Sequence, residues 1–169
     1  MALDERPRRV PDDEEAEVDL LIRQGRLEEA EERLRRRLAA GGADEARLLS
    51  KWAGLLLRRG KTEAAERLLD RALARDPACA PAWLNRGNLA LHRDRLDEAE
   101  HCFRKALELR PEYAAAYNNL AVVFKRRGQL DRMVAALKAA ARAERAAATA
   151  PWWRRWSPAG RLGLRGPQP

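Results

Sequence analysis

The sequence has little of the chemistry that enzymes use. Its 169 residues include two cysteines, two histidines, two serines and two threonines, and aromatic residues make up only 5%. No nucleophile–base arrangement, glycine-rich phosphate loop or cluster of metal ligands is visible. His101 and Cys102 are adjacent and would point apart on a helix, which argues against joint metal binding. We therefore expect no enzyme activity, no catalytic residue, no metal and no cofactor.

Long apolar runs are missing too. The chain opens with MALDERPRRVPDDEE, which lacks the hydrophobic stretch of a signal peptide, and no window approaches the ~18 apolar residues of a spanning helix. Cys79 and Cys102 lie 23 residues apart without metal-type spacing, as free thiols of a reducing compartment would. We expect a cytoplasmic protein.

What the chain does have is charge, unevenly distributed. Charged residues make up 36% of the chain and the net charge is +8. Residues 1–45 hold 9 basic against 14 acidic residues, 46–79 hold 8 against 4, 80–113 hold 6 against 6, 114–147 hold 7 against 2, and 148–169 hold 4 against none. Such a field favours an acidic protein or peptide partner at the C-terminal half. Nucleic acid is not favoured, because no basic strip interleaved with aromatic residues is visible.

One template recurs at a spacing of 34 residues. Three sets of residues mark it: Gly60, Asp94 and Gly128; Ala65, Ala99 and Met133; Ala72, Ala106 and Ala140. This period indicates stacked helix pairs, none of which can bury its apolar face alone. It divides the chain into a degenerate unit at 11–45 and three further units at 46–79, 80–113 and 114–147. We expect residues 1–10 to be disordered, residues 148–169 to form a separate tail, and the acidic run at 28–32 to be a solvated face.

The third unit resembles a tetratricopeptide repeat. The pattern of that family, W-x2-L-G-x2-Y followed by A-x3-F and P, is matched at Trp83, Gly87, Ala99, Phe103, Ala106 and Pro111. The second unit matches at Ala53, Gly60, Ala65, Ala72 and Pro77, the fourth at Tyr117, Leu120, Ala121, Phe124, Gly128 and Ala140, and the first at Gly25, Leu27 and Ala30. The resemblance implies an all-α, right-handed solenoid of antiparallel helix pairs. Its larger gaps are expected to be filled by Trp83, Tyr117, Phe103 and Phe124.

Members of this family are usually non-catalytic scaffolds, so the resemblance implies binding of a peptide or protein segment on the concave surface formed by the first helices. Two rows recur there: Lys51, Asn85 and Asn119, and seven residues along, Arg58, His92 and Arg126. We add Asn88, Asn118 and Lys125 to these candidates, because carboxamides suit the backbone of an extended ligand and cations attract carboxylates. Alternatively, the asparagines belong to generic repeats of the family. The family's carboxylate clamp for chaperone tails is matched only at Asn85, since Ser50, Gly54, Ala115 and Asn119 replace its other residues.

The tail holds three of the five tryptophans within five residues. Arg154 and Arg155 stand between the pair Trp152 and Trp153 and the single Trp156. They could cap the end of the repeat array or dock on a partner; a membrane anchor is less favoured, because Pro151 and Pro158 would interrupt any helix there. Self-association through the ends of the array and this tail, giving a homo-oligomer, is the second hypothesis for the whole chain.

Overall fold

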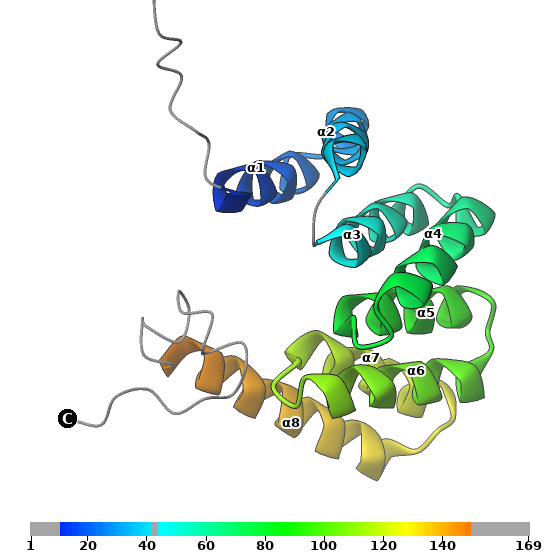
Figure 1. The fold of residues 1–169 in the computed structure, drawn as a ribbon. Helices are drawn as coiled ribbons and strands as arrows, with labels where there is room; N and C mark the ends of the chain where they lie inside the picture. Colours follow the sequence, from blue (N-terminus) through cyan, green and yellow to red (C-terminus); the bar gives the residue numbers. More distant parts are fainter. Residues whose placement is uncertain (1–10, 42–43, 150–169) are drawn as a thin grey trace, which may run out of the picture. The chain divides into compact units, whose positions relative to one another are not determined.

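The structure is a computed structural model that describes residues 11–41 and 44–149 (Figure 1). These residues form helices and no strand, which confirms the all-α class predicted from the period. The helices are α1 (Pro11–Arg23), α2 (Leu27–Ala40), α3 (Glu45–Arg58), α4 (Thr62–Arg75), α5 (Ala80–His92), α6 (Leu96–Leu109), α7 (Ala114–Arg126) and α8 (Leu130–Thr149). The expectations for residues 1–10 and for the tryptophans and arginines of the tail lie outside the described residues.

The turn inside each helix pair has one recurring conformation. The middle residue of its three has a positive φ in every repeat: 74° at Gly25, 71° at Gly60, 55° at Asp94 and 70° at Gly128. Glycine adopts this left-handed region without steric cost, and aspartate is one of the few other residues that tolerates it. The same backbone hydrogen bond, 2.9 Å long, closes each turn: Arg26 to Leu21, Lys61 to Leu56, Arg95 to Ala90 and Gln129 to Phe124. The residues that recur at this point of the period are therefore explained by the turn, which needs a residue that tolerates a positive φ.

The described helices belong to two compact units, one ending at Leu89 and one beginning at Ala90. In the first unit, successive helices pack on one another from α1 to α4. Val18, Leu21, Ala30, Leu34, Leu48 and Leu55 form one buried cluster of α1, α2 and α3. A second cluster adds the start of α5 to α3 and α4 through Ala46, Leu49, Ala53, Leu56, Leu57, Ala65, Leu69, Ala72, Cys79, Ala82 and Leu89. Each helix pair thus buries its apolar face against the next pair, as in a solenoid.

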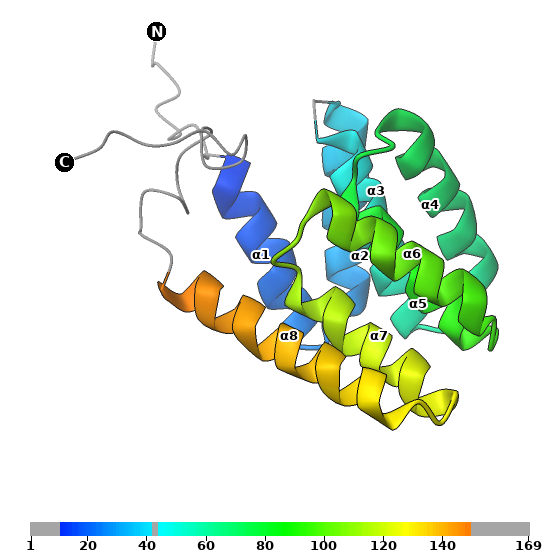
Figure 2. The same cartoon turned by 90° about the horizontal axis from the view of Figure 1, so that it is seen from below.

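In the second unit, α7 packs against both α6 and α8. Both views show α7 and α8 running side by side (Figures 1 and 2). Alanines let these helices approach, with Ala136, Ala140 and Ala143 buried on α8. Phe103 on α6 is fully buried, and Phe124 on α7 is 6% exposed.

The aromatic residues divide into two groups. Phe103 and Phe124 fill the interior as expected, but Trp83 and Tyr117 are only half-buried. The Trp83 indole Nε1 donates a hydrogen bond of 2.9 Å to the carbonyl of Pro77, so this ring lies against the loop that precedes α5. The tryptophan of the family pattern therefore packs on a loop here, because Pro77 ends the preceding helix pair just before it.

Candidate interaction surface

The most accessible candidate surface is one side of α7. Its exposed residues recur at helical spacing: Ala115, Asn118, Val122, Lys125 and Arg126. The opposite side, which includes the buried Leu120, Val123 and Phe124, packs within the second unit. A carboxamide, an isopropyl group and two cations are therefore presented side by side to solvent.

Val122 is part of this surface, although sequence reasoning missed it. Its side chain is 41% exposed, which makes it one of the most exposed large apolar residues of the described chain. The signal was available, because Val122 lies one period after Asn88, which the sequence did select. A search for polar residues alone passed over it.

Arg126 is held in place by the turn that precedes α6. Its Nη1 donates to the carbonyl of Leu91 and to the Asp94 carboxylate, both at 3.1 Å. The side chain remains 46% exposed and that of Asp94 is 79% exposed, so the pair is open to solvent. Lys125 is exposed and has no ion pair among the described residues, as is also true of Arg58 on α3. His92 and Asn118 are exposed, and Asn119 is half-buried.

The Asn85 side chain is engaged in hydrogen bonds to a neighbouring helix. Its Nδ2 donates to the carbonyl of Ser50 at 2.8 Å and to the Ser50 hydroxyl at 3.2 Å. Ser50 is fully buried. A Cβ atom on Gly54 would lie only 3.1 Å from Asn85 Nδ2, so the carboxamide lies directly on the surface of α3. The small residues at 50 and 54, which replace residues of the carboxylate clamp, are what allow this contact.

The remaining candidates of the first unit are also engaged. Asn88 Nδ2 donates to Asn85 Oδ1 at 3.4 Å, and the Lys51 ammonium pairs with the Asp19 carboxylate of α1 at 2.8 Å. The Lys51 side chain is only 20% exposed. Arg58 is therefore the candidate of this unit that stays most accessible, and the two predicted rows do not consist of equivalent, free side chains.

Buried carboxylates form a second polar feature. Glu31 on α2 pairs with Arg59 at 2.8 Å, and Glu100 on α6 pairs with Arg127; both acids are less than a tenth exposed. Each pair links a second helix to the end of the following first helix. The interpretation of residues 28–32 as a wholly solvated face is wrong at Glu31, because the next helix covers it.

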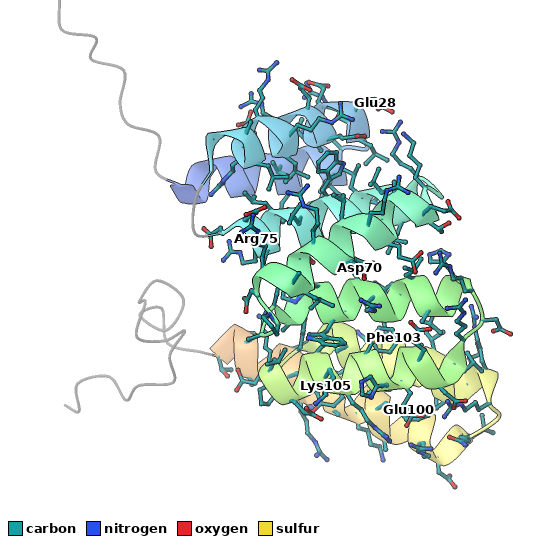
Figure 3. All side chains as sticks on the ribbon, turned by 45° about the vertical axis from the view of Figure 1, so that its right-hand side comes forward. Glu28, Asp70, Arg75, Glu100, Phe103 and Lys105 are labelled. Carbon is teal, nitrogen blue, oxygen red and sulfur yellow. The ribbon has the colours of Figure 1, made fainter. Side chains whose placement is uncertain are left out.

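Figure 3 labels Glu100 among the side chains of α6. Burial by itself raises the pKa of its carboxyl. A hydrogen bond from Arg127 and the positive charges of Arg104, Arg127 and Arg132 oppose that effect and leave the pKa below its ordinary value of 4.5. The group is therefore a charged structural anchor. Sequence reasoning missed it, although Glu31, Glu66 and Glu100 share one place in the repeat.

Comparison with known proteins agrees with this architecture. Models of the tetratricopeptide repeat match residues 46–89, 80–113 and 102–135, which together span more than half of the chain. The protein belongs to the tetratricopeptide repeat family. No curated protein sequence matches the chain.

Three solved structures share the fold at low identity. PilF of Pseudomonas aeruginosa is 22% identical, with a TM-score of 0.65 over 78% of this chain and 61% of that one. MamA is 21% identical, with a TM-score of 0.61 over 78% and 76%. YrrB, described as a tetratricopeptide repeat protein with an unusual peptide-binding site, is 21% identical, with a TM-score of 0.56 over 75% and 64%. Within the described ranges, none of the helices has the length and apolar character needed to cross a membrane.

Proposed function

We propose that this protein is a non-catalytic scaffold that binds an acidic segment of a partner protein on the exposed side of α7. Tetratricopeptide repeat proteins are in general protein-interaction scaffolds, which sets the class. The peptide-binding site of YrrB supports a peptide-like ligand for this architecture. The observation that carries the proposal is the exposed side of α7.

Packing does not explain the residues on that side. Asparagine and valine are both mediocre helix formers, and Asn118 and Val122 contribute little to the interior because both are exposed. Together with Lys125 they provide what an extended acidic segment needs. The carboxamide can both donate to and accept from a peptide backbone, Val122 contacts an apolar side chain, and Lys125 attracts a carboxylate.

Two carboxylates of the chain itself pair with cations that an acidic ligand would otherwise contact. Asp94 holds Arg126 and Asp19 holds Lys51 in the free protein. An incoming acidic side chain would exchange with Asp94 instead of meeting a fully hydrated cation. This exchange limits the affinity that Arg126 contributes, whereas Lys125 on the same helix has no such competitor among the described residues.

A paired peptide array tests the proposal. The full chain is applied to immobilised short peptides, each present in an acidic form and in a form with every Asp and Glu replaced by its amide. We expect selective retention of acidic forms, and fluorescence polarisation of the best peptide then gives its dissociation constant. Lys125→Glu combined with Arg126→Glu should raise that constant roughly tenfold.

A second double variant separates a specific site from overall charge. Arg67 on α4 and Arg145 near the end of α8 are exposed and lie outside the first helices. Arg67→Glu with Arg145→Glu changes the net charge by the same amount and should leave the constant within about twofold. Equal weakening by both double variants, or equal retention of acidic and amide peptides, would show that the exposed side of α7 is not the binding surface.

A further inference from the structure

The last described helix exposes several apolar side chains on one side, and one of them occupies a place that is buried in each earlier repeat. Leu130, Val134 and Leu137 lie on one side of α8 at intervals of four and three residues, and are 62%, 42% and 45% exposed. Leu137 occupies the place that Leu34, Leu69 and Phe103 occupy in α2, α4 and α6. Those three residues are 0%, 1% and 0% exposed. The repeat position of Leu137 is therefore apolar in all four repeats, but its side chain is buried in the first three and exposed in the last.

The first described helix shows the complementary anomaly. Leu20 on α1 is 51% exposed, yet it occupies the place of Leu55 on α3, Leu89 on α5 and Val123 on α7. Those equivalents are 1%, 4% and 0% exposed.

Inside the array, these two places meet. Leu34 and Leu55 belong to one buried cluster, and Leu69 and Leu89 belong to the other. In the second unit, α6 with Phe103 packs against α7 with Val123. Two of these junctions therefore place a second-helix residue equivalent to Leu137 and a first-helix residue equivalent to Leu20 in one buried cluster, and at the third junction the two helices that carry them pack together.

The polar pair of the junction has changed at both ends together. Inside each unit, a buried glutamate meets an arginine at the end of the next first helix, as Glu31 meets Arg59 and Glu100 meets Arg127. The same two places are Val134 on α8 and Gln24 after α1. A junction between α8 and α1 would therefore contain neither half of the ion pair, and no charge would be buried without a partner.

Charge selects among the possible occupants of the α8 surface. The sequence of α1 has six acidic residues and one arginine, whereas α8 has four basic and two acidic residues. The chain's own segment 150–169 carries four arginines and no acid, so it would be repelled by α8. The acidic α1 of another copy complements the basic charge of α8, and it carries the apolar residue that takes this place in the junctions between repeats.

We propose that copies of this protein associate head to tail, with α1 of one copy packing on α8 of the next through Leu20 and Leu137. The contact reproduces the junction between repeats in place of a further repeat. It is heterologous, so one contact leaves a free α1 and a free α8, and the assembly grows into a ring or an open chain. This inference goes beyond the binding of an acidic segment and uses different residues, so either can fail alone.

Sedimentation equilibrium of the full chain tests the contact. We expect an average mass that rises with concentration, and a dissociation constant that increases at least roughly tenfold in Leu20→Glu and in Leu137→Glu. Both leucines are half-exposed, so neither change should disturb folding, which circular dichroism checks. Leu109→Glu is the matched control: this leucine at the end of α6 is 41% exposed and lies at neither place, and it should leave the mass profile unchanged.

Mixing the two variants gives the sharpest result. Leu20→Glu retains an intact α8 surface and Leu137→Glu an intact α1 surface, so two separately monomeric samples should form pairs, and only pairs, when combined. A full chain that stays monomeric at all concentrations would overturn the proposal, as would association that survives either substitution or variants that fail to pair. Association that appears only after Trp152, Trp153 and Trp156 are changed to alanine would show instead that the tail covers α8.

Discussion

The first helices of the two units use similar side chains in opposite ways. On α3 and α5, Asn85 is turned onto Ser50 and Lys51 is turned onto Asp19, so amide and ammonium groups hold helices together. On α7, Asn118 and Lys125 face solvent. The difference follows the place in the repeat, because Lys51 and Asn85 share the place of the half-buried Asn119, whereas Asn118 and Lys125 stand at other places. A polar residue on a first helix can therefore either hold neighbouring helices together or face solvent, where a ligand can reach it.

Stability measurements should show the largest difference between the two kinds of asparagine. Asn85→Ala removes the carboxamide that donates to the buried Ser50 carbonyl and hydroxyl, so we expect the free energy of unfolding to fall by about 1–3 kcal/mol. Asn118→Ala removes an exposed side chain and should change it by less than about 0.5 kcal/mol. Urea unfolding followed by circular dichroism compares them. Equal losses in the two variants would contradict the division into asparagines that hold helices together and asparagines that face solvent.

Acid titration extends the comparison to the second unit, where Glu100 is also turned inward. The pKa of Glu100 is lowered in the folded protein, so its contribution to stability is present above 4.5 and is lost as pH falls through the lower folded value. The urea midpoint of the native protein should therefore drop on acidification, and Glu100→Gln should flatten this dependence. Glu98→Gln, an exposed acid of the same helix, is the control and should keep the native slope.

The smallest expected effect concerns the carboxylate that competes for Arg126. Asp94→Asn keeps a residue that tolerates positive φ but removes the charge that holds the guanidinium. An acidic peptide should then bind roughly two- to threefold more tightly, with the gain falling in high salt. Polarisation titrations at two ionic strengths measure it. Weaker binding by Asp94→Asn would indicate that the turn orients Arg126 for the ligand and does not compete with it.

The 34-residue period was sufficient to predict the helix pairs, their turns and the family. The period could be recognised because each turn needs one residue that tolerates a positive φ and each junction between helices needs alanine. Residues that meet these two requirements recur at fixed positions in the sequence. The positions of Gly60, Asp94 and Gly128 alone predicted three turns. Which polar residues stay exposed was predicted less well, since the sequence does not reveal which side chain a neighbouring helix will engage.

The sequence by itself determined that this chain forms stacked helical repeats, with charge running from an acidic start to a basic end. Only the tertiary structure decided which polar residues remain available, that Glu31 and Glu100 are buried, and that Leu20 and Leu137 are uncovered. The physical reason is distance along the chain. A helix and its turn are fixed by residues within one or two turns of one another, whereas the surroundings of Asn85 or Leu137 are set by a helix from another repeat.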